Sequence, residues 1–254
     1  MRKIASPDNP HFRDWLKLAG SARQRRKSGL TLLDGAHLLA ACLDAGLRPV
    51  EILLGGEPTA EVAALLRRVE DVRVSQLDAA LFAQLSELKT PTGVLALLAL
   101  PQVALAPARF ALLLEDIQDP GNLGSMLRSA AAAGCDAVFL SKGCADAWSP
   151  RVLRAAMGGH FVMRIHEDAD LLQVAGEMTV YAAVLGAESS LFECELRAPL
   201  AFAIGNEGAG LSAELQSRCH PFAIPMPGQV ESLNAAAAAA ICLFEAVRQG
   251  TTHA

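Results

Sequence analysis

Three polar loops in the second half of this chain carry residue types that could bind a ligand and assist a reaction. The first covers residues 116–124, with Asn122 among its polar side chains, and an isolated arginine, Arg128, follows it. Apolar residues over 123–130 recur at helical spacing, and Arg128 falls outside that stripe. A strand predicted over 112–114, a polar turn and a helix start together form a common ligand-binding place in α/β proteins. For this segment alone, an ordinary strand–helix connection with a solvated arginine remains the alternative.

The second and third loops also follow short apolar strands. The strand predicted over 200–204 runs into 205–210, Gly-Asn-Glu-Gly-Ala-Gly, where three glycines let the backbone approach a ligand closely. The order is G-x-x-G-x-G and not G-x-G-x-x-G, which argues against a nicotinamide cofactor. The third loop, 226–234, follows a strand predicted over 222–225. It leads into an alanine-rich helix from Ala235 whose small side chains suit close packing.

Together these loops resemble the motifs of the SpoU (TrmH-type) RNA ribose 2'-O-methyltransferases, part of the SPOUT superfamily. The first motif is represented by residues 119–124 with Arg128, the second by 204–211, and the third by 224–228 with 231–234. All three occur in the order of the family, and each alone would be a weak signal. The positions that matter most show no departure from the family pattern: Asn122, Arg128, Glu207, Ser232 and Asn234.

The resemblance implies an α/β fold with a C-terminal SPOUT domain. That domain would hold a mostly parallel sheet and a trefoil knot, in which the second and third loops enclose S-adenosylmethionine. It would also form a homodimer, with the alanine helix at the interface. Alternation of strands and helices independently predicts the mostly parallel sheet, with further strands over 137–140, 161–165 and 179–185. The knot and the dimer rest on the resemblance alone.

The chemistry of methyl transfer explains the residue types at these positions. A ribose 2'-hydroxyl is a weak nucleophile, and an arginine beside it can stabilise the charge that develops as its proton leaves. We expect this role for Arg128, because an arginine pKa above about 12 disfavours it as the base; the proton acceptor stays open. The resemblance implies that Asn122 orients Arg128 or the ribose, and that Glu207 fixes the second loop or holds Arg128. Ser232 and Asn234 would line the acceptor site.

Backbone groups of the glycine-rich loops are expected to hold the adenosine part of the cofactor. The residues concerned are Leu185, Gly186, Gly205, Ile224, Met226, Gly228 and Leu233. No metal is expected, because the six cysteines form no C-x-x-C pair and no histidine follows zinc spacing. The cysteines are predicted to be buried thiols in a reducing compartment.

The net charge of −5 is spread unevenly along the chain. Residues 1–30 hold eight basic and two acidic residues, so this segment carries +6 and the remainder −11. A basic cluster can hold a phosphate backbone, and the predicted RNA contacts are Arg23, Arg25, Arg26 and Lys27. A solvated basic helix is the alternative for this segment.

Turn residues divide the chain into a small α/β domain over 1–100, a linker over 101–107 and the catalytic domain over 108–254. The first domain resembles the substrate-binding domain, similar to ribosomal protein L30e, that precedes many SpoU catalytic domains. Asp34-Gly35 stands where relatives usually have Glu-Gly. Predicted elements are a helix from Asn9-Pro10, strands over 30–33, 50–54, 72–74 and 94–100, and helices over 59–69 and 79–88.

The sequence therefore predicts an S-adenosylmethionine-dependent RNA ribose 2'-O-methyltransferase. The two-domain layout favours ribosomal RNA over transfer RNA as the substrate, by analogy with the family. No apolar run approaches the roughly 20 residues that span a bilayer, and the N-terminus lacks the apolar core of a signal peptide. We therefore expect a cytoplasmic protein with no membrane partner. A non-catalytic RNA-binding accessory protein and an oxidoreductase with a nucleotide cofactor are the alternatives from other classes.

Overall fold

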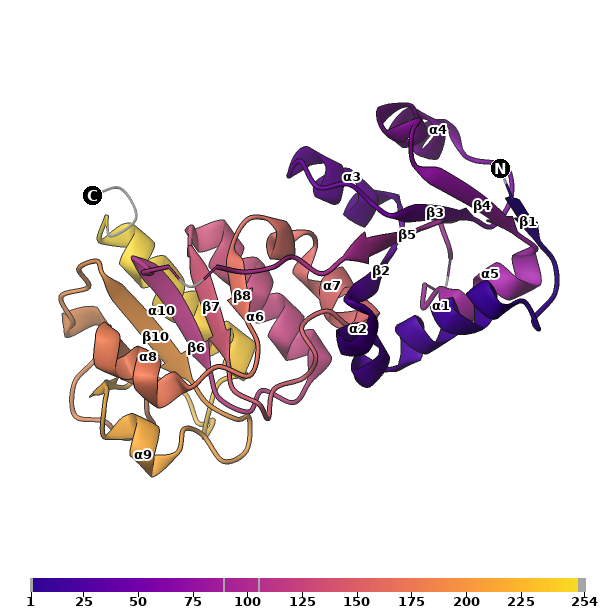
Figure 1. Cartoon of the computed structure of the whole chain (residues 1–254). Helices are drawn as coiled ribbons and strands as arrows, with labels where there is room; N and C mark the ends of the chain where they lie inside the picture. Colours follow the sequence, from indigo (N-terminus) through magenta and orange to yellow (C-terminus); the bar gives the residue numbers. More distant parts are fainter. Residues whose placement is uncertain (1, 89, 105, 251–254) are drawn as a thin grey trace. The chain divides into compact units, whose positions relative to one another are not determined.

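The computed structural model describes residues 2–88, 90–104 and 106–250, which form two compact units (Figure 1). The first unit contains residues up to Gln102 together with Trp148–Phe161. The second unit contains Val103–Ala147 and the residues from Val162 onward. The sequence did not indicate that residues 148–161, which lie within the predicted catalytic domain, pack with the N-terminal elements.

The first unit is built on a five-stranded mixed sheet in the order β1-β4-β3-β5-β2. Strands β1, β4 and β3 run parallel, whereas β5 is antiparallel to both β3 and β2. The strand bounds are β1 (Arg2–Ile4), β2 (Leu30–Asp34), β3 (Glu51–Leu54), β4 (Arg73–Leu77) and β5 (Val94–Ala99). The edge strand β1 was not predicted from the sequence. Its Arg2 is tied to Glu51 on β3 by an ion pair of 2.9 Å.

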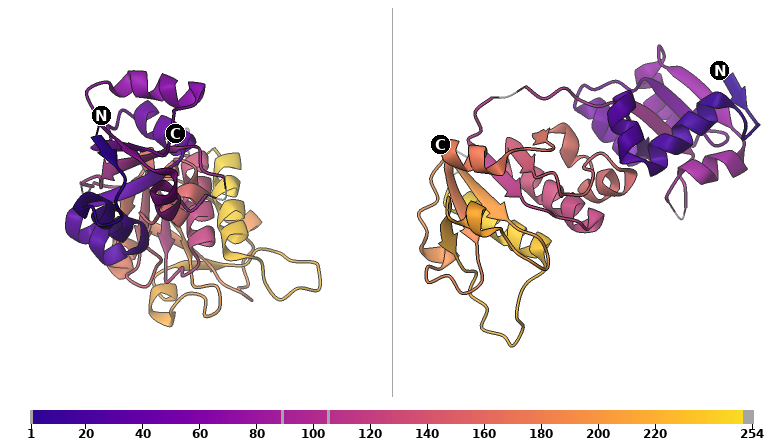
Figure 2. Two further views of the ribbon diagram at one scale, coloured as in Figure 1. Left: turned by 90° about the vertical axis from the view of Figure 1, so that its right-hand side faces the viewer. Right: turned by 60° about the horizontal axis from the view of Figure 1, so that its bottom comes forward.

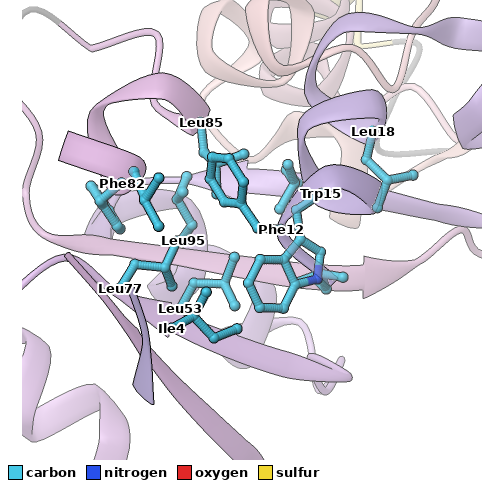
Figure 3. Packing of buried hydrophobic residues seen from close by; sticks show 12 residues of the cluster. Ile4, Phe12, Trp15, Leu18, Leu53, Leu77, Phe82, Leu85 and Leu95 are labelled. Atoms are coloured by element: carbon cyan, nitrogen blue, oxygen red, sulfur yellow. The ribbon is translucent and has the colours of Figure 1, made fainter. Parts of the chain in front are cut away.

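A hydrophobic core fills the space between this sheet and two of the helices (Figure 3). Helix α1 contributes Phe12, Trp15 and Leu18, which recur on one face, and α5 contributes Phe82 and Leu85. Asn9 caps α1 and Pro10 opens it, as the sequence predicts. The helices are α1 (Pro10–Gly20), α2 (Ala22–Ser28), α3 (Ala36–Asp44), α4 (Ala60–Leu66), η1 (Arg67–Val69), α5 (Ala79–Leu85), α7 (Pro150–Ala156) and η2 (Gly159–Phe161).

The second unit contains a six-stranded sheet in the order β11-β9-β10-β6-β7-β8. Every pair in it is parallel, which confirms the predicted mostly parallel sheet. The strands are β6 (Phe110–Leu114), β7 (Ala137–Leu140), β8 (Arg164–His166), β9 (Thr179–Ala183), β10 (Leu200–Ile204) and β11 (His220–Phe222). The helices are α6 (Pro120–Ala133), α8 (Leu171–Glu177), η3 (Leu191–Glu193), α9 (Ala213–Gln216) and α10 (Ala235–Arg248).

Two of the predicted strands begin or end at clearly different residues in the structure. The strand predicted over 222–225 is β11 over His220–Phe222, because Pro225 cannot donate a ladder hydrogen bond and the chain leaves the sheet before it. The strand predicted over 161–165 begins only at Arg164, since a 3₁₀ turn occupies Gly159–Phe161. The alanine-rich α10 packs against α6 and β10, as its small side chains favour. Among the described residues, no helix is long and apolar enough to cross a membrane.

Candidate functional site

The three motif loops leave the same edge of the second unit's sheet. Because all its strands are parallel, their carboxyl ends meet at one edge. The first loop follows β6, the second follows β10, which lies beside β6, and the third follows β11. This edge is called the catalytic edge below.

Asn122 joins the first motif to the other two. Its side chain Nδ2 donates to Oε1 of Glu207 at 3.1 Å, and its Oδ1 accepts from Nδ2 of Asn234 at 2.9 Å. These partners lie 85 and 112 residues away along the chain. Asp119 caps α6 by accepting from the backbone N–H of Asn122 at 2.7 Å, which fixes the start of this helix. The structure thus places Asn122, Glu207 and Asn234 in one hydrogen-bonded chain.

Asn234 has a second task beside that contact. Its Oδ1 accepts from the backbone N–H groups of Ala236 and Ala237, so it is the N-cap of α10. One side chain therefore ends the third loop, starts α10 and contacts Asn122. Asn234 had been expected only to line the acceptor site.

Glu207 is held as a carboxylate by the first loop. Backbone N–H groups of Gln118 and Asp119 approach its two oxygens at 3.4 and 3.3 Å, in addition to Asn122. Partial burial alone would raise the pKa of Glu207, but these hydrogen bonds outweigh it and the pKa lies below the ordinary value. Of the two roles implied for Glu207, the geometry matches fixation of the loops, because no contact joins it to Arg128.

The second loop is closed on itself at Gly205. Asn206 and Gly210 exchange two backbone hydrogen bonds of 3.1 and 2.9 Å. A Cβ at position 205 would lie only 2.2 Å from the carbonyl carbon of Gly210 and 2.3 Å from the N of Leu211. Glycine at 205 is therefore required by the loop's own backbone.

Arg128 and Ser232 are exposed side chains near these contacts in sequence. Within the described part of the chain, neither makes a hydrogen bond or ion pair, so neither has a structural task that would occupy its polar atoms. Arg128 lies on α6, two turns beyond its start, and the helix buries Leu123, Met126 and Leu127 on its other side. A guanidinium in this position is available to an incoming anion.

The residues expected to hold the cofactor lie in loops after β9, β10 and β11. Leu185 is 67% exposed and Gly186 adopts a φ of 76°, so the chain turns directly after β9. No residue of 224–233 forms a hydrogen bond to another described residue, through its backbone or its side chain. Figure 2 shows this stretch, just before α10, extending away from the rest of its unit. Its backbone donors and acceptors are free for a ligand.

The basic segment of the first unit is not uniform. Arg23, Arg26 and Lys27 are exposed on α2, as a nucleic-acid contact requires. Arg25 is only 4% exposed, and its guanidinium donates to the carbonyls of Leu18 and Ala19. Its assignment as an RNA contact is corrected: Arg25 fastens α2 to the end of α1. A helix this short has too few apolar residues for the sequence to show which face turns inward.

Two further acidic residues at the catalytic edge were missed in the sequence. Glu115 accepts from both the backbone N–H and the hydroxyl of Ser212, each at 2.7 Å, and so fastens the end of the second loop to the first. Asp116 has a φ of 56°, unusual for a residue with a side chain, and its carbonyl accepts from Nδ2 of Asn206 at 2.8 Å. Both adjoin the first motif, but nothing in a single sequence separates them from solvated carboxylates. Among the described residues, no cluster of three or more histidine, cysteine or acidic side chains could hold a metal ion.

Comparison with known proteins assigns a family to each part of the chain. Residues 109–244 match the SpoU rRNA Methylase family, and residues 9–96 match the MRM3-like substrate binding domain. The chain is 37% identical over 96% of its length to the 23S rRNA (guanosine(2553)-2'-O)-methyltransferase RlmP of Bacillus subtilis (strain 168), of which 98% is covered.

Solved structures agree with this result. The crystal structure of an RNA 2'-O ribose methyltransferase is similar with a TM-score of 0.83 and 30% identity, covering 98% of this chain and 99% of that one. The SpoU methyltransferase AviRb of Streptomyces viridochromogenes, in complex with the cofactor AdoMet, has a TM-score of 0.86 and 28% identity over 95% and 98% of the chains. A structure concerned with 2'-OH methylation of C/U34 on tRNA covers 99% of its own chain but only 57% of this one, with a TM-score of 0.52 and 30% identity.

Proposed function

The chain belongs to the SpoU rRNA methylase family, and from that premise we propose that it methylates a ribose 2'-hydroxyl of large-subunit ribosomal RNA. It is an S-adenosylmethionine-dependent RNA 2'-O-methyltransferase, like its full-length relatives. The observation that carries the site assignment is the hydrogen-bonded chain of Glu207, Asn122 and Asn234, which unites all three motifs. A ribosomal substrate is supported by the 23S rRNA relative, which matches both units. The tRNA-related structure leaves much of this chain unmatched, which disfavours a tRNA substrate.

S-adenosylmethionine fits the catalytic edge by the chemistry of its donor set, and it supplies an electrophilic methyl group when bound. Residues 224–233 offer backbone N–H and C=O groups that no described residue uses. Residues 224–233 follow β11. Leu185 and Gly186 follow β9, which pairs with β11, and Gly205 follows β10, which pairs with β9. We assign the backbone groups of these loops, with Ile224, Met226, Gly228 and Leu233, to the adenosine and methionine parts.

Arg128 is assigned to the acceptor hydroxyl. As the 2'-hydroxyl loses its proton, negative charge grows on the oxygen, and an unpaired guanidinium stabilises it and can bind the adjoining phosphate. Asn122 is held too firmly by Glu207 and Asn234 to turn toward Arg128 without breaking two hydrogen bonds. We therefore assign Asn122 to positioning of the ribose and Ser232, whose hydroxyl is free, to the same acceptor site.

Two properties of the whole molecule extend the proposal. We propose that the enzyme is a homodimer through its second unit, with the knot that the family resemblance implies. Phe244 on α10 supports a contact there, since this large apolar side chain is 48% exposed. We place the enzyme in the cytoplasm by analogy with its relative from the bacterium Bacillus subtilis (strain 168). Sedimentation of the purified protein tests the dimer, and a Phe244→Glu variant should shift it to monomer.

The test of function is transfer of labelled methyl groups to an in vitro transcript of 23S rRNA, with a tRNA pool as the comparison substrate. Arg128→Ala should change stability by no more than about 0.5 kcal/mol, because the side chain is exposed and unpaired. It should bind S-adenosylmethionine normally and lose transfer by roughly a hundredfold or more. Arg128→Lys should restore only part of the methyl-transfer activity, since an ammonium lacks the planar set of N–H donors that a guanidinium presents.

Mapping the methylated nucleotide, then replacing its 2'-hydroxyl by hydrogen, supplies the chemical control. Near-normal turnover by Arg128→Ala, or methylation of the 2'-deoxy substrate, would contradict the proposed mechanism. Preference for the tRNA pool would overturn the ribosomal substrate while leaving the enzyme class intact.

A further inference from the structure

The loops at the catalytic edge carry a strong excess of negative charge. They comprise residues 115–119, 141–147, 167–170, 184–190, 205–212 and 223–234. All of these residues are described, and together they hold ten carboxylates: Glu115, Asp116, Asp119, Asp146, Glu167, Asp168, Asp170, Glu188, Glu207 and Glu231. The same loops contain a single cationic side chain, Lys142. An RNA backbone that reaches this edge meets repulsion nearly everywhere except at Lys142.

Lys142 sits on a loop that is fastened closely to the first motif loop. Strand β7, which this loop follows, pairs directly with β6. Ser141 accepts from the backbone N–H of Asp116 at 2.9 Å and donates its hydroxyl proton to Oδ1 of Asp116 at 2.6 Å. A Cβ at Gly143 would lie 2.1 Å from the same Oδ1, so a side chain there would displace the carboxylate of Asp116.

The other end of the loop is fixed in the same way. Cys144 directs its thiol to the carbonyl of Leu114 at 3.2 Å, and the backbone N–H of Ala145 donates to the carbonyl of Ile117 at 2.8 Å. Each residue on either side of Lys142 thus contacts the first loop or its strand. Lys142 itself is exposed and makes no hydrogen bond or ion pair with any described residue. A rigid backbone therefore presents one unpaired ammonium beside the first motif.

We infer that Lys142 binds the phosphate backbone of the substrate RNA at the catalytic edge. The inference rests on the proposed RNA methyltransferase function and adds a second cation, on a different element, to Arg128 of α6. An ammonium makes a point-charge contact with a phosphate, which suits binding without base selection. Its fixed loop lowers the cost of ordering the contact. The alternative is a solvated lysine that only improves solubility.

The test compares Lys142→Ala with Arg218→Ala, measured by RNA affinity across a salt series without turnover. Arg218 is a matched control, because its side chain is also exposed and pairs with no described residue, but it precedes β11 at the opposite edge of the same sheet. With the 23S rRNA transcript as probe, Lys142→Ala should weaken binding by roughly fivefold at about 50 mM salt. The slope of log affinity against log salt should fall by about one unit. Lys142→Arg should retain the slope, and Arg218→Ala should leave it unchanged.

Kinetics separate this role from a structural one. In Lys142→Ala the KM for RNA should rise while kcat at saturating RNA, S-adenosylmethionine affinity and Tm stay at wild-type values, because the exposed side chain makes no hydrogen bond or ion pair with a described residue. Equal salt slopes for wild type and Lys142→Ala would overturn the inference, as would an equal loss in Arg218→Ala. Absence of methyl transfer by the wild-type protein would instead refute the proposed function, since the binding series does not depend on turnover.

Discussion

Substitution of Gly205 by alanine should damage the second motif loop through the loop's own backbone. The added Cβ would lie 2.2 Å from the carbonyl carbon of Gly210, 2.3 Å from N of Leu211 and 2.4 Å from the Gly210 carbonyl oxygen. Relief requires the loop to open by about an ångström, which breaks the two hydrogen bonds between Asn206 and Gly210. Each lost hydrogen bond costs a net of about 1 kcal/mol, and the displaced packing costs about 1 kcal/mol or more. Gly205→Ala should therefore lower the free energy of unfolding by roughly 3 kcal/mol.

Gly208→Ala is the matched control within the same loop. A Cβ there meets only Oδ1 of Asn206 at 3.6 Å, an ordinary contact. Urea unfolding at equilibrium should show a loss of about 3 kcal/mol for Gly205→Ala and no more than about 0.5 kcal/mol for Gly208→Ala. Calorimetric titration with S-adenosylmethionine should show weaker binding in the first variant only. If the two variants are equally stable and bind the cofactor equally, the tight closure of this loop does not control the site.

Three other perturbations separate structural from functional charge. Joint replacement of Arg23, Arg26 and Lys27 by alanine should remove two to three phosphate contacts and leave Tm unchanged. Each lost contact should lower the slope of log RNA affinity against log salt by about 0.7–0.9. A slope identical to that of the wild type would show that α2 does not contact the RNA. Arg25→Ala should instead lower the free energy of unfolding by about 2 kcal/mol, because two carbonyls lose a buried charged donor, and wild-type stability would contradict its structural role. The depressed pKa of Glu207 means that its contacts stabilise the fold fully above the ordinary value of 4.5 and are lost as pH falls through the lower folded value. The stability gap between wild type and Glu207→Gln should therefore be constant from pH 8 to about 5 and should shrink at lower pH; a gap that grows on acidification would refute this sign.

Sequence patterning predicted the elements that carry the site and left their mutual contacts open. The strand over 200–204 and the strand over 137–140 are found at the predicted bounds, since short apolar runs between turn residues leave little freedom. The residues of the three motifs were identified through family resemblance, and the parallel sheet through alternation. The pairing of Asn122 with Asn234 spans 112 residues and depends on how α10 returns to α6, which no local pattern encodes.

The failures have equally physical causes. Arg25 is indistinguishable in sequence from its basic neighbours, because tertiary packing and not composition decides which face of α2 is buried. The segment 148–161 packs with the first unit through contacts such as the hydroxyl of Thr31 with the carbonyl of Trp148 at 2.6 Å. Such contacts between distant segments follow from the assembled fold.

The two hydrogen-bond partners of Asn122, Glu207 and Asn234, fix the orientation of its side-chain amide. Asn234 has committed its carbonyl oxygen to the start of α10 and can offer only N–H groups, while Glu207 as a carboxylate can only accept. The amide of Asn122 therefore has one permitted orientation, with nitrogen toward Glu207 and oxygen toward Asn234. An amide has two N–H groups and two lone pairs, so one of each remains. Asn122 can therefore still donate one hydrogen bond and accept one, and a ribose hydroxyl matches this pair because its oxygen accepts while its O–H donates.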